Sequence, residues 1–225
     1  MSGRVLDLVR DSELAAHLVS LERLTEDRGR RGTGLAALDR LLGGGWPRAA
    51  LSEISGRRSS GRTTVVRAAL AAAIAAGETV ALVDAGGSLD ARAWTGLGLL
   101  WIRCAPSQAL KAADLVVAAG GFGMVALDLC DATLRIPDAA WVRLRHTARA
   151  QGTTVLIAGA ARRLGAFAAA AIDLGGAPAF DADGPPLFTG LDVRALRLRD
   201  GRGVRLQAEN ENAQPCASLV FTSRS

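Results

Sequence analysis

Short apolar segments alternate with helix-like segments along most of this chain, and this alternation restricts the possible folds more than any other feature. Five segments are apolar enough to be buried strands: 50–54, 79–85, 99–104, 123–129 and 153–159. Periodicity predicts helices between them, near 62–76, 90–97, 107–119 and 138–150. Strands that are apolar on both faces are typical of a mostly parallel sheet with helices on both sides. We therefore expect an α/β fold.

The C-terminal part of the chain has a different pattern. Pro, Gly and Asp become frequent after residue 178, and residues 193–206 then form two alternating runs around Asp200 and Gly201. Two alternating runs that flank an Asp-Gly pair predict a β-hairpin. We expect this hairpin, together with residues 217–221, to extend one edge of the sheet in antiparallel fashion.

The N-terminal part predicts one amphipathic helix. Leu14, Leu18 and Leu21 fall on one face of a helix over residues 10–26, with charged residues opposite. This leucine face either binds a partner or covers the protein's own core. A charged, glycine-rich stretch follows, so we divide the chain into a helix with its linker (1–31) and a main domain (32–225).

Composition is consistent with one globular domain and narrows the class of partner. The 225 residues are 49% hydrophobic, which is enough to bury a full core. The net charge is +5, and of the 27 basic residues only Lys111 is a lysine. This positive excess favours polyanionic partners such as nucleic acid. Three cysteines without a CxxC pair indicate reduced thiols in the cytoplasm, and neither a secretion signal nor a membrane helix is expected.

The most informative segment is GRRSSGRTT, residues 56–64, which lies between a predicted strand and a predicted helix. Its glycines allow the backbone to curl so that successive amide groups point inward, and the following helix adds its positive dipole end. We interpret the segment as a phosphate-binding loop, with Thr63 placed to bind Mg²⁺ through its hydroxyl. The alternative is a plain turn followed by a helix cap. The candidate nucleotide-binding residues in the loop are Gly56, Ser59, Ser60, Gly61, Arg62, Thr63 and Thr64.

Arg62 departs from the phosphate-binding pattern, which has a lysine at this position. Arginine is a longer, planar donor, so the exchange keeps the positive charge but not the geometry at the β- and γ-phosphates. We therefore expect weak binding of ATP or ADP with Mg²⁺, and inefficient hydrolysis.

Asp128 is the second acidic element that such a site needs. It ends the apolar segment 123–129, and a carboxylate at the end of a neighbouring strand would hold Mg²⁺ through water. Alternatively, Asp128 only caps the next turn. The phosphate-binding loop upstream favours the metal-binding interpretation, with Thr63 and Asp128 as the metal residues.

Groups of arginines can neutralise DNA phosphates and give salt-dependent binding without sequence preference. Arg197 and Arg199 fall on one face of a predicted hairpin strand, and Arg162 and Arg163 follow the last predicted parallel strand. We name these four as DNA-binding candidates. Solvated surfaces or ion pairs explain them equally well. Further arginines occur in the same regions, namely Arg143, Arg145, Arg149, Arg194, Arg202 and Arg205.

The segment TGLAALDRLLGGGWPRAALSEISGRRSSGRTT (33–64) resembles the corresponding segment of the RecA recombinase family, and VALVDAGGSLD (80–90) is similar to the next one. The resemblance covers residues 32 to about 160 and implies a RecA-like nucleotide-binding core. It also implies a catalytic glutamate at the position of Gly86 and a phosphate-sensing glutamine near Ala160. Neither is present in this chain, so the resemblance implies weak ATPase activity or none.

A short RecA-like chain with a degraded phosphate loop resembles the ImuA family, also described as SulA-like. The resemblance implies a role in DNA-damage-induced (SOS) mutagenesis and translesion DNA synthesis, close to the nucleoid. The partners that it implies are DNA, RecA, an ImuB-like inactive Y-family polymerase and an error-prone replicative-type polymerase. Two alternatives remain: a DNA-dependent ATPase in which Asp84 or Asp90 supplies the base, and a SulA-like inhibitor of cell division.

Overall fold

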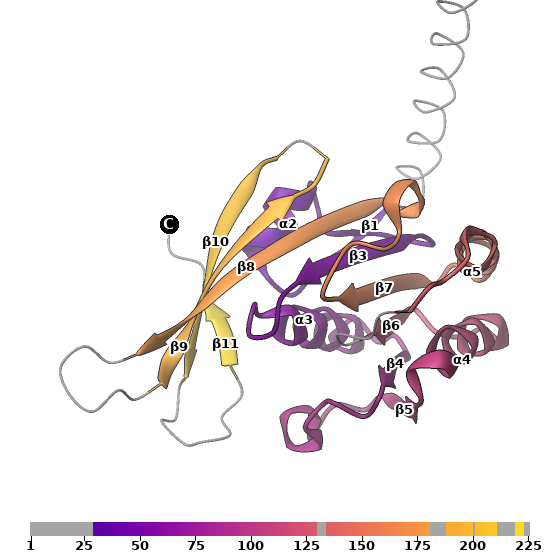
Figure 1. Ribbon diagram of the computed structural model, residues 1–225, viewed down its shortest axis with the longest axis horizontal. Helices are drawn as coiled ribbons and strands as arrows, with labels where there is room; N and C mark the ends of the chain where they lie inside the picture. Colours follow the sequence, from indigo (N-terminus) through magenta and orange to yellow (C-terminus); the bar gives the residue numbers. More distant parts are fainter. Residues whose placement is uncertain (1–28, 130–133, 181–187, 200, 211–218, 223–225) are drawn as a thin grey trace, which may run out of the picture.

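The computed structural model describes residues 29–129, 134–180, 188–199, 201–210 and 219–222. Its centre is a nine-stranded sheet in the order β11-β10-β9-β8-β3-β7-β6-β4-β5 (Figure 1). The amphipathic helix predicted over residues 10–26 lies outside the described residues, as do Cys130 and Cys216.

Six neighbouring strands of the sheet are parallel. They are β8 (Ala170–Phe180), β3 (Leu51–Gly56), β7 (Thr154–Gly159), β6 (Met124–Asp128), β4 (Val80–Ala85) and β5 (Leu100–Cys104). Four of them, β3, β7, β6 and β4, are buried over their whole length, which explains why their sequences are mostly apolar. The expected α/β fold with a mostly parallel sheet is confirmed.

The C-terminal strands extend this sheet in antiparallel fashion. β9 (Phe188–Arg197) pairs with β8, β10 (Gly203–Asn210) pairs with β9, and β11 (Leu219–Thr222) pairs with β10. This confirms both the hairpin and the final strand that the sequence predicts.

Strand β8 has no counterpart among the predicted elements. Its sequence contains Gly175, Gly176 and Pro178, residue types that disfavour strands. β3 pairs with β8 only up to Leu174, so the second half of β8 pairs with β9 alone. An edge of this kind tolerates the missing N–H of proline.

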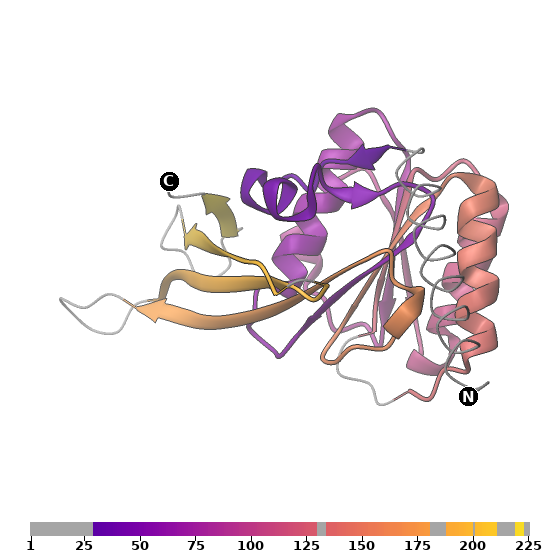
Figure 2. The same ribbon diagram turned by 90° about the horizontal axis from the view of Figure 1, so that it is seen from above.

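Helices cover both faces of the parallel sheet, as Figure 2 shows from above. α3 (Arg62–Ala75) and the short α2 (Ala36–Leu42) pack on one side, which we call the α3 face. α4 (Pro106–Ala119) and α5 (Asp138–Gln151) cover the other side, the α5 face. Small residues let α3 pack closely: a Cβ atom at Gly34 would lie 2.6 Å from the carbonyl oxygen of Ala68 in α3. No helix in the described part of the chain has the length and apolar composition needed to cross a membrane.

The last residues of the expected linker are part of the folded domain. Arg30–Arg31 (β1) pairs with Trp46–Pro47 (β2) in a small antiparallel ladder. Arg31 is buried and forms an ion pair with Glu78, which also accepts a 3.0 Å hydrogen bond from Arg48. Burial lowers the pKa of the Arg31 guanidinium, and the neighbouring Glu78 carboxylate acts in the opposite direction.

The helix predicted near 90–97 is shorter than expected. It forms a single 3₁₀ turn, η1 (Ala91–Trp94), and the chain then continues through Gly96 and Gly98. Glycines at this spacing end a helix because they lose more conformational freedom than other residues when they are ordered.

Candidate functional site

The predicted phosphate-binding loop lies between β3 and α3. β3 ends at Gly56 and α3 begins at Arg62. Gly61, just before the helix, has a left-handed backbone (φ 85°), and Ser59 is also left-handed (φ 59°). These residues turn the chain sharply onto the N-terminus of the helix, where unpaired amide groups favour an anion. The order of strand, tight turn and helix N-terminus agrees with the predicted phosphate-binding loop, whose ligand stays a prediction.

The side chain of Arg62 folds back into its own loop. Arg62 is only 8% exposed, and its Nη1 donates a 2.6 Å hydrogen bond to the carbonyl oxygen of Gly56. The guanidinium thus connects the end of β3 to the start of α3. A lysine at this position of a phosphate-binding loop instead reaches the β- and γ-phosphates. The backbone of the loop fits a phosphate, whereas the Arg62 side chain does not fit the lysine's role.

Strand β8 lies directly against the loop. A Cβ atom at Gly56 would overlap Oγ of Ser60 and would lie 2.8 Å from the carbonyl oxygen of Leu174. A Cβ atom at Gly176 would lie 3.0 Å from Cα of Ser60. Gly56 therefore requires glycine, whereas a side chain at Gly176 would have to displace Ser60 by a few tenths of an ångström. Ser60 is buried, and its Oγ has no hydrogen-bond partner among the described residues.

Asp128 and Asp84 end two neighbouring strands at the edge of the sheet where the loop also lies. Strand pairing places Asp128 level with Ala158 of β7, which is level with Ile54 of β3. Asp84 of β4 is the direct partner of Asp128. Residues at the same level of a parallel sheet share a face, and Ala158 and Ile54 belong to the core under α3. Both carboxylates are therefore on the α3 face.

Thr63 lies half-buried in the first turn of α3. The fold thus brings Thr63 and Asp128 to the same edge and the same face of the sheet. Their role in holding Mg²⁺ stays a prediction. Nowhere in the described ranges, this edge included, do three His, Cys, Asp or Glu side chains gather as a metal site.

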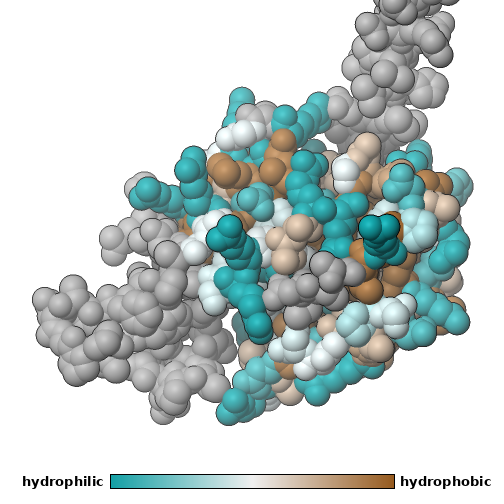
Figure 3. All heavy atoms as spheres, viewed as in Figure 1, coloured by the Kyte–Doolittle hydropathy of each residue, from teal (hydrophilic) through white to brown (hydrophobic). Residues whose placement is uncertain are grey.

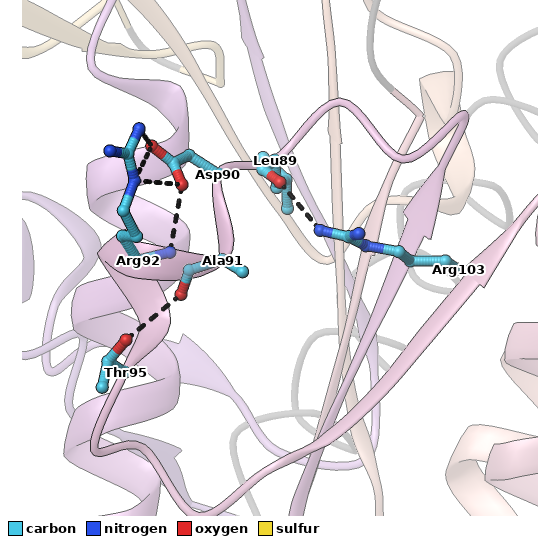
Figure 4. Close-up of polar contacts among 6 residues, drawn as sticks. All are labelled: Leu89, Asp90, Ala91, Arg92, Thr95 and Arg103. Atoms are coloured by element: carbon cyan, nitrogen blue, oxygen red, sulfur yellow. Dashed lines mark hydrogen bonds and ion pairs between the residues drawn. The ribbon is translucent and has the colours of Figure 1, made fainter.

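Asp84 is compensated by a neighbouring cation. It is fully buried, its Oδ1 accepts a 3.1 Å hydrogen bond from the Ser88 amide, and its Oδ2 lies 3.6 Å from Nε of Arg103. The Arg103 guanidinium is 4.6 Å from the ring centroid of Trp101 and donates a 3.1 Å hydrogen bond to the carbonyl oxygen of Leu89 (Figure 4). Arg103 therefore holds the Asp84 carboxylate in an ion pair.

Gly86 and Asp90 are the two other positions considered for a catalytic base, and the structure shows the contacts of both. Gly86 has no side chain, has a left-handed backbone (φ 88°), and donates its N–H to the carbonyl oxygen of Cys104 at 2.8 Å. The Asp90 carboxylate caps η1 and forms an exposed pair with Arg92, with Nη2 at 2.9 Å from Oδ2 (Figure 4). Ala160, where the resemblance implies a glutamine, directly follows β7.

Glu53 is a site residue that sequence reasoning missed. It lies in the middle of β3 and is 2% exposed, and its Oε1 accepts hydrogen bonds from the backbone N–H groups of Arg163 and Leu164, the latter at 3.1 Å. The loop after β7 is therefore fixed to the sheet by a buried carboxylate. The signal was present in the sequence, because a charged residue inside a buried strand needs a partner.

The four DNA-binding candidates differ in their surroundings. Arg162 is exposed, whereas Arg163 is half-buried and donates a 2.8 Å hydrogen bond to the carbonyl oxygen of Leu134. Arg197 is the last residue of β9, and Arg199 lies beyond it in the turn. The expectation that Arg197 and Arg199 share one face of a strand is therefore wrong, because the hairpin begins to turn at Arg197. Their role in DNA binding stays a prediction.

The arginines of α5 have structural partners. Arg143 forms a 3.0 Å ion pair with Asp114 of α4, and the Arg145 guanidinium lies 5.6 Å from the ring centroid of Phe167. The Arg143 contact agrees with the ion-pair alternative for this group of basic residues, whereas Arg145 contacts an aromatic ring.

Comparison with known proteins identifies the family. A family model of the RecA N-terminal domain matches residues 18–165. Protein RecA of Francisella tularensis subsp. novicida is 39% identical over 103 residues, which cover 43% of this chain and 29% of the relative. Protein RecA of Francisella tularensis subsp. holarctica has the same identity and coverage. The chain thus aligns with less than a third of the length of these relatives. Because the family model covers more than half of the chain, and the sheet and loop agree with it, the chain belongs to the RecA N-terminal domain family.

Proposed function

We propose that this protein is a RecA-like binding protein that has lost most ATPase chemistry and acts in DNA-damage-induced mutagenesis and translesion DNA synthesis. Its partners are DNA, RecA and the two polymerase-type proteins implied by the resemblance to the ImuA family, an ImuB-like protein and an error-prone replicative-type polymerase. ATP or ADP with Mg²⁺ binds weakly at the loop of residues 56–64. The protein works in the cytoplasm, at the nucleoid.

The position of the Arg62 side chain carries this proposal. Its guanidinium is buried and its Nη1 is bonded to Gly56 within the loop, so this donor is not available to the terminal phosphate. Stabilising the charge that develops on transferring phosphate is the main task of such a site. Because the Arg62 guanidinium is bonded within the loop, we expect it to stabilise the charge on a transferred phosphate poorly.

The positions for the base and the sensor support the same conclusion. Gly86 and Ala160 have neither a carboxylate nor an amide, and the nearby carboxylates Asp84 and Asp90 are paired with arginines. A positioned general base contributes roughly 10²–10⁴-fold to a rate. We therefore expect turnover at least about 100-fold below that of a recombinase.

ATP hydrolysis by the purified protein, with and without single-stranded DNA, tests the loss of catalysis. Recombinase-like turnover that disappears in Arg62→Ala would refute it and would establish the alternative of a working ATPase. The double variant Arg62→Lys with Gly86→Glu is expected to stay far below a recombinase, because the sensor is still missing. Glutamate at Gly86 is also strained by the left-handed backbone, by about 1–2 kcal/mol.

A deletion strain tests the cellular role. We expect a lower frequency of ultraviolet-induced mutations, restored by the wild-type gene and by Arg62→Ala alike, because catalysis is not required. Filamentous cells on overexpression, with an unchanged mutation frequency in the deletion strain, would instead favour the inhibitor of cell division.

Neutralising Arg162 and Arg163 tests the DNA-binding loop. Each lost phosphate contact lowers the slope of log affinity against log salt by about 0.9 for duplex DNA. The variant Arg162→Ala is more informative than Arg163→Ala, because Arg163 also supports Leu134. An unchanged salt titration for Arg162→Ala would show that DNA contacts lie elsewhere.

A further inference from the structure

Two arginines face each other on the antiparallel extension of the sheet. Arg194 of β9 and Arg205 of β10 are direct cross-strand partners, and both are exposed. The neighbouring Val193, Ala195 and Leu206 are buried in the core that contains α2 and α3. Side chains alternate along a strand, so Arg194 and Arg205 are on the α5 face.

No ion pair compensates these two charges among the side chains that the structure describes, although Asp192 lies two residues from Arg194 on the same face of β9. Like charges directly opposite each other destabilise a sheet. Neither arginine has an ion-pair partner among the described residues. Asp173 of β8 is on the same face, but its Oδ1 accepts a 2.6 Å hydrogen bond from Ser55. The two like charges lower the stability of the sheet, and they form no described contact within the protein. Their position therefore indicates that they bind an anion from outside the protein.

Glycines without side chains flank the pair. Gly175 of β8 is the partner of Arg194 on its other side, and Gly203 of β10 lies next to Arg205. Both glycines are exposed. α2 and α3 lie on the opposite side of this ribbon in Figure 2, and Figure 3 shows that hydrophilic side chains cover much of the side seen in Figure 1. A broad ligand can therefore approach the strand backbone here.

Arg162 lies near the start of the connection from β7 to β8. Its loop continues into Leu164 and Phe167, which pack in the core under α5, so the connection from β7 to β8 crosses the α5 face. β8 then joins this region to the ribbon that carries Arg194 and Arg205.

We infer that the Arg194–Arg205 pair binds the phosphate backbone of duplex DNA. Guanidinium groups bind phosphate oxygens in bidentate fashion, and the net charge of +5 attracts polyanions. The described residues next to the pair in the sheet, Gly175, Leu196 and Gly203, are not aromatic, so the pair itself offers no ring on which unpaired bases could stack, which favours duplex over single-stranded DNA. This inference rests on the DNA-binding part of the proposed function and adds a contact surface to it.

Fluorescence anisotropy with a labelled duplex tests the inference. Release of counterions makes each phosphate contact worth about eightfold in affinity at 0.1 M salt, so Arg194→Ala with Arg205→Ala should weaken binding about sixtyfold and lower the salt slope by about 1.8. The matched control is Arg92→Ala with Arg143→Ala, which removes the same charge from two exposed arginines that are paired with acids. The control should change affinity less than threefold, estimated roughly from screening of distant charges.

Arg205→Glu separates a binding defect from a folding defect. It places opposite charges across the two strands, so we expect a higher melting temperature together with weaker DNA binding. If the wild type binds DNA but neither Arg205→Glu nor the double alanine variant weakens binding, the inference fails while the proposed function stands. If the wild type does not bind DNA at all, both fail. Displacement of the duplex by polyglutamate at equal charge concentration would also overturn the inference, in favour of an acidic protein partner.

Discussion

Replacing Glu53 tests how the loop after β7 is held in place. Glu53 is buried, and its carboxylate accepts hydrogen bonds from two backbone N–H groups, those of Arg163 and Leu164. A hydrogen bond to a charged group contributes about 1.5–3 kcal/mol, and a neutral one roughly 0.5–1.5 kcal/mol. Glu53→Gln keeps the acceptor without its charge, so we expect a loss of about 2 kcal/mol. Glu53→Leu leaves both amides without an acceptor, and we expect about 4 kcal/mol.

Urea unfolding followed by tryptophan fluorescence measures these losses. For a chain of this length they correspond to decreases in melting temperature of about 4–8 °C for Gln and twice that for Leu. Hydrogen exchange at the amides of Arg163 and Leu164 should accelerate in both variants, while exchange within β7 changes only as much as global stability does.

Arg92→Ala is the control for Glu53, because it removes a charged side chain that is 74% exposed and should change stability by less than about 0.5 kcal/mol. Wild-type stability in Glu53→Leu, or unchanged exchange at the two amides, would show that the carboxylate does not hold this loop.

Two further changes probe charges that the fold buries. Glu78→Gln should lower the free energy of unfolding by about 3 kcal/mol, because it leaves Arg31 buried without an acidic partner; a loss below about 1 kcal/mol in urea unfolding would contradict this. Burial raises the pKa of the Cys104 thiol, and the Asp84 charge raises it further. Alkylation of Cys104 at pH 8, followed by mass spectrometry, should therefore be slower than alkylation of a cysteine peptide. The Asp84→Asn variant should be alkylated faster than the wild type. Because the folded state holds this proton more tightly, the thiol's contribution to stability falls as pH rises through the ordinary cysteine range, and equal alkylation rates would argue against the shift.

The parts of the fold that depend on local pattern were predictable. The apolar strands around 50–54 and 153–159, and the hairpin around Gly201, follow from periodicity and turn chemistry, which are encoded by adjacent residues. The loop between Gly56 and Arg62 was predictable for the same reason, since its glycines and flanking elements lie next to one another. By contrast, β8 owes its strand form to pairing with β3 and β9, which its own glycines and proline do not reveal.

The RecA-like α/β core, the strand-loop-helix order of residues 50–76 and the arginine in place of the lysine could all be read from the sequence. The direction of the Arg62 side chain emerges only from the folded chain, because the hydrogen bond from Arg62 to Gly56 depends on the curvature of the loop. The tertiary structure also decided which charges are neighbours: Asp84 with Arg103, Glu53 with the loop after β7, and Arg194 with Arg205. These contacts join residues from different elements through strand order and register, which no local pattern specifies.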